Sequence, residues 1–146
     1  MSGYVLVLSG PNLGSLGARD PAVYGTATLD ELLARTAAAA ATHDLGVRHV
    51  HSNHEGDLVD AIEQREPGCA GVIANLGALT HTSVVLHDAL EVVDCPVIEV
   101  HLSNPAAREP FRHVSVVAPV VAGSIAGFGP LSYDLAVEAI ARLAAR

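Results

Sequence analysis

The sequence predicts an α/β fold in which helices cover both faces of a parallel β-sheet. Two observations lead to this prediction. Short apolar runs rich in Val, Ile and Leu recur along the chain, as in strands that are buried on both faces. Segments with helix-start signals separate these runs, and strands that alternate with helices form parallel sheets. Half of the 146 residues are apolar, enough for one core, so we expect a single domain over residues 1–146.

The expected strands are short apolar runs, most of them bounded by a glycine, proline or asparagine. In chain order they are residues 4–9, 47–52, 71–75, 96–101 and 114–117.

Capping signals and good helix formers mark the expected helices. Thr28 and Glu31 form a capping box before an alanine tract, and Thr80 is the expected cap of a later helix. The helices are expected at about residues 28–42, 55–66, 81–93 and 131–145. Residues 10–25 have no internal periodicity, and a connection of this length is often a lid over a site.

Glu99 and His101 lie two residues apart on the fourth expected strand, so their side chains share one face. A carboxylate that holds an imidazole raises its proton affinity, which suits general acid catalysis near neutral pH. The same pair also occurs as a purely structural contact. Polar or small residues end two other strands, at residues 9–12 and at Asn75, and ligands of open parallel sheets bind at such carboxyl ends. This convergence favours an active site, with the loop arginines Arg108 and Arg112 facing it.

Composition excludes several classes of function. All eight basic residues are arginines, which excludes Schiff-base catalysis on lysine, lysine-bound pyridoxal phosphate and a Walker phosphate loop. The formal net charge of −8 argues against nucleic acid and against an anionic membrane surface as partners. Glycines at 10, 14 and 17 lack the spacing of a nucleotide fingerprint. His51 and His54 lack a third ligand for zinc.

Cysteine usage and the N-terminal residues bear on localisation. Cys69 and Cys95 stand in different expected segments without metal-ligand spacing, which fits a reducing cytosol better than a disulfide framework. The first apolar run is too short for a signal peptide or a membrane span. We therefore expect a cytoplasmic protein with no membrane partner.

Six ordered motifs between about residues 5 and 133 resemble those of type II 3-dehydroquinate dehydratase. They are Gly10-Pro11-Asn12-Leu13, Arg19-Asp20-Pro21 with Val23-Tyr24-Gly25, Ser52-Asn53-His54-Glu55-Gly56, Thr80-His81-Thr82-Ser83, Glu99-Val100-His101-Leu102-Ser103-Asn104 and Arg108-Glu109-Pro110-Phe111-Arg112-His113. The resemblance implies a flavodoxin-like three-layer sandwich with a five-stranded parallel sheet in strand order 2-1-3-4-5. It also implies anti elimination of water from 3-dehydroquinate to 3-dehydroshikimate through an enolate, without cofactor or metal. The assembly would be a dodecamer, a tetramer of trimers, serving the shikimate pathway towards chorismate and aromatic amino acids, or quinate catabolism.

The resemblance further implies roles for individual residues. Tyr24 matches the base that removes the C2 proton, and Arg19 the group that favours its phenolate. His101 matches the acid that protonates the departing C1 hydroxyl, and Glu99 the partner that orients it. The other matches contact substrate: Asn12 through the water that stabilises the enolate, Asn75, Leu102 and Ser103 at the carboxylate and hydroxyl, His81 and Arg112 at ring hydroxyls, and Asp88 in a neighbouring subunit's site.

Several positions depart from the commonest family pattern, none of them a matched catalytic residue. They are Ser9, Leu76, Leu79, His87, Pro105, Ala106 and Val114. They bear on subunit contacts and turnover rate more than on the reaction.

Without lysine, proton removal beside a ketone must pass through a hydrogen-bonded enolate. A tyrosine with a pKa of about 10 is ionised in roughly one part in a thousand at pH 7, a deficit of about 4 kcal/mol. A guanidinium at about 4 Å in an effective dielectric near 20 contributes about 4 kcal/mol, so Arg19 has the right order of effect on Tyr24.

Two other function classes remain at this point. A flavodoxin-like module could bind flavin or accept a phosphoryl group, but the chain has no Trp for stacking and has Asn75 where a receiver needs aspartate. A catalytically silent paralogue would not need Arg19, Tyr24 and His101. Tyr4 and Tyr133 are expected to be packing residues.

Overall fold

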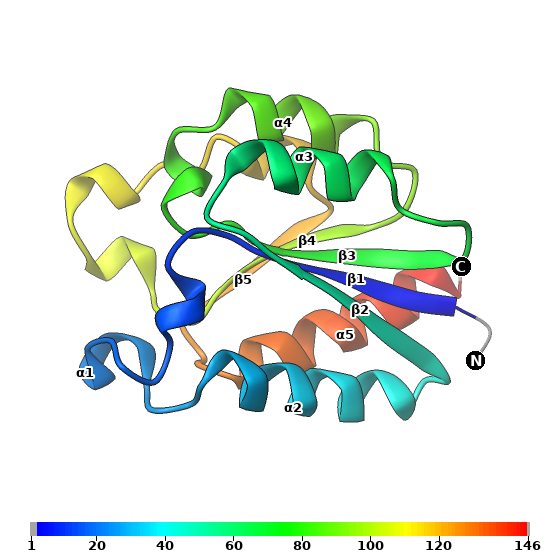
Figure 1. Ribbon diagram of the computed structural model, residues 1–146, viewed down its shortest axis with the longest axis horizontal. Coiled ribbons are helices and arrows are strands. Elements are labelled where there is room, and N and C mark those ends of the chain that lie inside the picture. Colours follow the sequence, from blue (N-terminus) through cyan, green and yellow to red (C-terminus); the bar gives the residue numbers. More distant parts are fainter. Residues whose placement is uncertain (1–2, 146) are drawn as a thin grey trace.

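The computed structural model, which describes residues 3–145, contains a five-stranded parallel sheet in the order β2-β1-β3-β4-β5 (Figure 1). The predicted flavodoxin-like order is therefore confirmed. The strands are β1 (Gly3–Ser9), β2 (Leu45–His51), β3 (Cys69–Asn75), β4 (Val97–His101) and β5 (Gly123–Ala126). Since β1 pairs with both β2 and β3, the strand order reverses there, and the carboxyl ends of β1 and β3 form the switch point where ligands of such sheets bind.

Helices cover both faces of the sheet (Figure 1). On one face lie α2 (Leu29–Ala41) and α5 (Leu131–Ala144), and on the other lie α3 (Glu55–Glu63) and α4 (Val84–Glu91). Successive side chains of a strand point to opposite faces, so Val7 of β1 joins the core under α2 and α5 while Leu8 joins the core under α3 and α4. Within residues 3–145, no helix has the length and apolar character needed to cross a membrane.

The long connection after β1 is partly helical. It contains a 3-10 helix at Leu13–Ser15 and the single turn α1 (Pro21–Tyr24). The Asp20 side chain accepts a hydrogen bond from the Ala22 N–H and Pro21 occupies the first helical position, both of which favour a helix start. This turn places Tyr24 at its carboxyl end.

Gly10 brings the loops after β1 and β3 into direct contact. Its N–H donates to the Asn75 carbonyl at 2.8 Å, and a Cβ at residue 10 would lie 2.3 Å from the Leu76 carbonyl oxygen. No side chain larger than hydrogen fits there, so the glycine allows the two strand ends to form one continuous wall.

Two sequence predictions are wrong. The fifth strand is not at residues 114–117, because that segment forms a turn whose backbone does not pair with a strand. Its Val116 N–H donates to the Thr80 carbonyl at 2.9 Å instead. The helix expected at residues 81–93 is present as α4, preceded by a 3-10 helix at Gly77–His81, but its predicted cap is wrong. Its cap is Ser83, whose Oγ accepts from the Leu86 N–H, rather than Thr80. The remaining predicted elements are present with ends shifted by up to three residues.

Candidate active site

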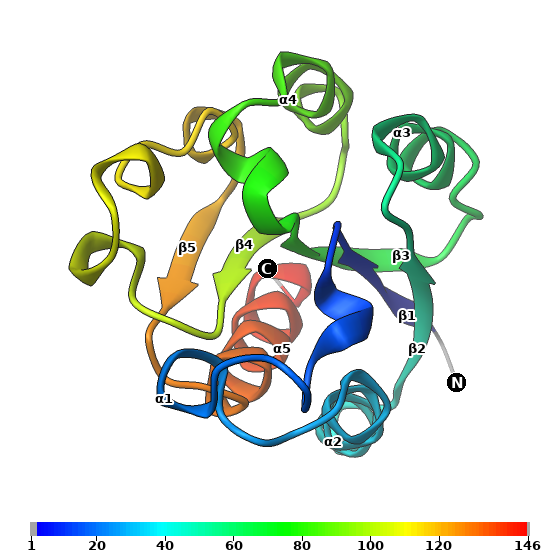
Figure 2. The same cartoon turned by 60° about the vertical axis from the view of Figure 1, so that its left-hand side comes forward.

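A pocket opens at the carboxyl ends of β1, β3 and β4. Nine of the eleven predicted site residues line it, namely Asn12, Arg19, Tyr24, Asn75, His81, His101, Leu102, Ser103 and Arg112. In Figure 2, which brings this end of the sheet forward, α1 and the yellow-green segment after β4 lie on the same side. The pocket therefore joins residues from strand ends with residues from two separate loops.

The Tyr24 phenol lies between two guanidinium groups. Arg19 Nη2 donates to Tyr24 Oη at 2.9 Å, and Arg108 Nη2 donates to the same oxygen at 2.8 Å. Both guanidiniums also lie over the ring, at 4.0 Å and 5.0 Å from its centroid. Charge-assisted donors of this kind favour the phenolate over the phenol. The sequence placed Arg108 at the crevice but gave it no role, because nothing in the sequence pairs residues 84 positions apart.

His101 is held by Glu99, as the two-residue spacing predicts. His101 Nε2 and Glu99 Oε2 are 2.6 Å apart, and the side chains are 12% and 5% exposed. The second carboxylate oxygen, Oε1, accepts a hydrogen bond from Ser115 Oγ at 2.8 Å. With Nε2 committed to Glu99, Nδ1 is the ring nitrogen left to exchange a proton with a ligand.

His81 stacks beside His101, with ring centroids 6.5 Å apart and planes inclined by 15°. Its Nδ1 lies 2.7 Å from the Val114 carbonyl oxygen. A carbonyl only accepts, so Nδ1 carries a proton and Nε2 of the neutral ring is an acceptor.

Asn75 is oriented by a buried tyrosine. Its Nδ2 donates to Tyr133 Oη at 3.0 Å, and its Oδ1 accepts from the Gly77 N–H at 3.4 Å. Burial raises the pKa of Tyr133 to about 12, so the phenol stays neutral while its oxygen accepts. Tyr133 is thus a packing residue, as expected, and also fixes the amide of a pocket residue.

Asn12 adopts a left-handed backbone conformation with φ of 70°, which non-glycine residues other than asparagine and aspartate seldom adopt. Its N–H donates to Asn53 Oδ1 at 3.0 Å. This turn directs the chain after β1 across the pocket. Leu102 and Ser103 follow β4 directly, and Ser103 Oγ lies 3.4 Å from Arg108 Nη1. Arg112 Nε lies 3.1 Å from Glu109 Oε2.

Two predicted residues lie outside the pocket lining. Glu99 stands behind His101, whereas Asp88 is on α4, exposed, and 2.9 Å from His87 Nδ1. His87, Asp88 and Glu91 could together hold a cation, but they are largely exposed and separate from the pocket.

The positions that depart from the family pattern occupy supporting places. Ser9 Oγ is 2.8 Å from His49 Nε2, and Leu76 and Leu79 pack in the core under α4. Pro105 begins a 3-10 helix at the pocket rim, and Ala106 donates its N–H to Asn104.

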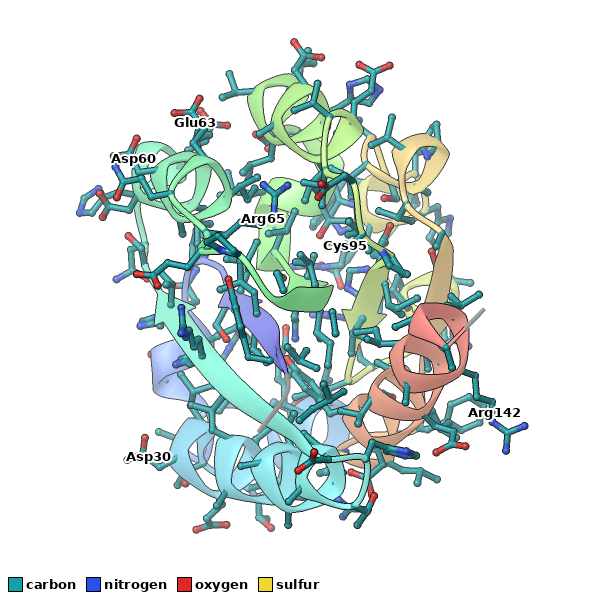
Figure 3. The ribbon with its side chains drawn as sticks, turned by 90° about the vertical axis from the view of Figure 1, so that its right-hand side faces the viewer. Asp30, Asp60, Glu63, Arg65, Cys95 and Arg142 are labelled. Carbon is teal, nitrogen blue, oxygen red and sulfur yellow. The ribbon has the colours of Figure 1, made fainter. Side chains whose placement is uncertain are left out.

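Cys69 and Cys95 lie together at the opposite end of the sheet. Their sulfur atoms are 3.8 Å apart, and Figure 3 shows Cys95 beside Arg65 at this end. Hydrogen bonding from the Cys95 thiol lowers the pKa of Cys69 to about 6, while the same contact raises that of Cys95. Sequence spacing could not reveal this pair, because the cysteines come from segments that meet only in the folded sheet.

Comparisons with known proteins identify the family of this chain. Residues 3–141 match the family model described as Dehydroquinase class II. The chain is 52% identical over 138 residues to a 3-dehydroquinate dehydratase of Mesorhizobium japonicum, covering 94% of this chain and 96% of the relative. It is 54% identical over 141 residues to that of Azorhizobium caulinodans, covering 97% and 95%. The crystal structure of type II dehydroquinase from Propionibacterium acnes matches with a TM-score of 0.88 at 42% identity, covering 97% of this chain and 98% of that chain.

Proposed function

The chain belongs to the class II dehydroquinase family and is a 3-dehydroquinate dehydratase, a hydro-lyase; from this premise we propose that Tyr24 and His101 eliminate water through an enolate. The observation that carries the proposal is the meeting, in one pocket, of a phenol bonded to two guanidiniums and an imidazole bonded to a carboxylate. The first group is suited to act as a base, and the second is suited to act as an acid. Because the chain belongs to this family, the flavin-binding and phosphoacceptor functions considered from the sequence are set aside.

In the first step, the Tyr24 phenolate takes the proton from C2 of 3-dehydroquinate. Arg19 and Arg108 each donate to the phenol oxygen, which offsets the cost of ionising it at neutral pH. The C2 electron pair moves into the ketone, forming an enolate. Asn12 would hold a water that donates to the enolate oxygen, which replaces the iminium ion that a lysine-free chain cannot form.

In the second step, the enolate collapses and the C1 hydroxyl leaves as water. His101 donates the proton from Nδ1 while Glu99 stabilises the imidazolium through Nε2. The leaving group departs on the face opposite the proton that Tyr24 removes, which gives an anti elimination.

The remaining pocket residues would fix the substrate. Its carboxylate enters a protein whose formal net charge is −8, so local donors must offset repulsion. We assign the carboxylate and hydroxyl contacts to Asn75 and to the N–H groups of Leu102 and Ser103, and the ring hydroxyl contacts to His81 and Arg112.

We further propose a cytoplasmic dodecamer, a tetramer of trimers in which Asp88 reaches a neighbouring site. Val84 and Val85 on α4 are 63% and 51% exposed and stand beside Asp88 on the same helix, so a subunit contact at α4 would bury apolar surface. Light scattering should give about 180 kDa, twelve times the 15.0 kDa chain. A mass near one or three chains would contradict this assembly. Either the shikimate pathway or quinate catabolism would use the same chemical step.

The reaction is tested by following the ultraviolet absorbance of the conjugated enone formed from 3-dehydroquinate, with and without borohydride. Enzyme incubated with substrate and borohydride, then freed of both and given fresh substrate, should form enone at the rate of untreated enzyme, because borohydride inactivates only an enzyme that forms an iminium. Tyr24→Phe and His101→Ala should each lose about 100-fold or more in kcat.

Matched controls are available for both variants. The Tyr4 hydroxyl donates to the Glu66 carbonyl, and His43 pairs with Glu138, both outside the pocket. Tyr4→Phe and His43→Ala should therefore stay within about twofold of the parent rate. Absence of enone would sink the proposed reaction, and full activity in Tyr24→Phe would sink the assignment of the base.

A further inference from the structure

The turn at residues 114–118 contacts His81 and the Glu99 carboxylate that holds His101, without lining the pocket. The Val114 carbonyl accepts from His81 Nδ1 at 2.7 Å. The next residue, Ser115, donates from Oγ to Glu99 Oε1 at 2.8 Å. Two consecutive residues thus hold His81 directly and His101 through its carboxylate.

The Ser115 hydroxyl has a defined direction. The Ala118 N–H donates to Ser115 Oγ at 3.0 Å, which occupies a lone pair of the oxygen and leaves its proton for Glu99. The turn itself is tied down, because the Val116 N–H donates to the Thr80 carbonyl and Val117 is fully buried. Ser115 is therefore a donor held in place by backbone contacts.

Glu99 depends on this donor. The residue is 3% exposed, so water cannot readily supply hydrogen bonds to its carboxylate. Oε2 serves His101 and Oε1 serves Ser115, so each oxygen has one partner. Losing the hydroxyl would leave Oε1 buried without its donor, which favours protonation or rotation of the carboxylate.

We propose that Ser115 is a positioning residue for the acid of the reaction: its hydroxyl holds Glu99 directed at His101, so that the carboxylate stays bonded to the imidazole that delivers the proton. The kinetic part of this inference rests on the proposed function. Other titratable and charged groups near the His101 ring are His81, stacked on it, and the pocket residues Arg19, Tyr24, Arg108 and Arg112.

The test compares Ser115→Ala with Ser115→Thr, which retains the hydroxyl. Ser115→Ala should lower kcat about tenfold at pH 7, leave KM within about twofold, and move the alkaline limb of the pH–rate profile about one unit lower. Ser115→Thr should keep kcat and the alkaline limb close to their values in the parent, because the hydroxyl is retained. In a Glu99→Gln background, Ser115→Ala should add less than about twofold, because the serine acts through the carboxylate.

Ser83 provides a matched control. Its hydroxyl also donates to a glutamate, Glu55, and accepts an N–H three residues on, from Leu86, but neither Ser83 nor Glu55 lines the pocket. Ser83→Ala should lower the melting temperature about as much as Ser115→Ala does. It should leave the alkaline limb of the pH–rate profile where it is in the parent. An unchanged pH profile in Ser115→Ala, or an equal displacement in Ser83→Ala, would overturn the inference.

A readout without substrate separates this inference from the proposed reaction. The proton between His101 Nε2 and Glu99 should give a downfield ¹H NMR resonance in the parent protein, since the heavy atoms are 2.6 Å apart. Ser115→Ala should broaden or displace that resonance, and Ser83→Ala should not. An unchanged resonance would refute the positioning role even if the enzyme is active, whereas a displaced resonance in a protein that forms no enone would count only against the reaction.

Discussion

Removing either guanidinium from Tyr24 should shift the pH dependence of the reaction. Arg19 and Arg108 donate to the phenol oxygen at 2.9 Å and 2.8 Å. One guanidinium at about 4 Å in an effective dielectric near 20 contributes about 4 kcal/mol. The phenol is only half-buried and the two cations repel each other, so we expect about 2 kcal/mol from each.

Arg19→Ala and Arg108→Ala should therefore each lower kcat/KM at pH 7 by about 30-fold. The acidic limb of the pH–rate profile should move about 1.5 units higher, and raising the pH should recover much of the loss. The assay is enone formation measured between pH 5 and pH 9.

The control is Arg142→Ala, because Arg142 is exposed on α5 and pairs with Glu138 away from the pocket. Its profile should match that of the parent. An acidic limb that stays in place in both pocket variants would refute the reasoning, because the arginines would then bind substrate without favouring the phenolate.

Three further predictions concern other parts of the structure. Glu99→Gln should lower kcat about tenfold to 100-fold by destabilising the imidazolium; full activity at pH 7, measured by enone formation, would refute this role. Tyr133→Phe should remove the acceptor of the Asn75 amide and cost about 1–3 kcal/mol in urea unfolding, with a raised KM. Because the pKa of Tyr133 is raised to about 12 in the fold from about 10 unfolded, the parent should lose stability as pH rises above 10, and Tyr133→Phe should lose less; equal losses would contradict this. Alkylation of Cys69 by iodoacetamide, followed by mass spectrometry, should be half-maximal near pH 6. Cys95→Ala removes the thiol that donates to Cys69 and should shift that midpoint higher; a parent midpoint near 8.5 would contradict the hydrogen bond between the thiols.

Local sequence patterns predicted what depends on neighbours in the chain. The two-residue spacing of Glu99 and His101 determines that they share a strand face, and their contact is present. The capping box at Thr28 works as expected, with Oγ1 accepting from the Glu31 N–H. Strand alternation with helices gave the layer architecture, because that arrangement follows from burying both faces of a parallel sheet.

Predictions failed where tertiary contacts decide between equivalent local signals. Both Thr80 and Ser83 carry a capping hydroxyl, and only the folded chain shows that Thr80 lies within the 3-10 helix at Gly77–His81 while Ser83 caps α4. Residues 114–117 have the composition of a strand. Their polar groups instead bond to the side chains of His81 and Glu99, and no strand pairing forms. β5 is a short segment, Gly123–Ala126, with little apolar periodicity of its own.

Long-range partners were beyond reach of the sequence for the same reason. Arg108 meets Tyr24, and Tyr133 meets Asn75, only because distant segments converge at one end of the sheet. The individual residue types were visible in the sequence, but their pairing is a property of the topology.

The pocket is built from two separate parts of the chain, because the base is held by two loops that meet at the Tyr24 oxygen and the acid is held by a strand. The acid is anchored to β4 and to a turn fixed by backbone contacts, whereas the base is anchored where residues 19–24 touch Arg108. Substitutions at the pocket-lining residue Pro105 and its neighbours 106–107 can therefore change the fit of altered cyclohexane acids while leaving the strand-borne half untouched. Natural divergence has the same freedom, so substrate range and proton delivery can change along separate mutational routes.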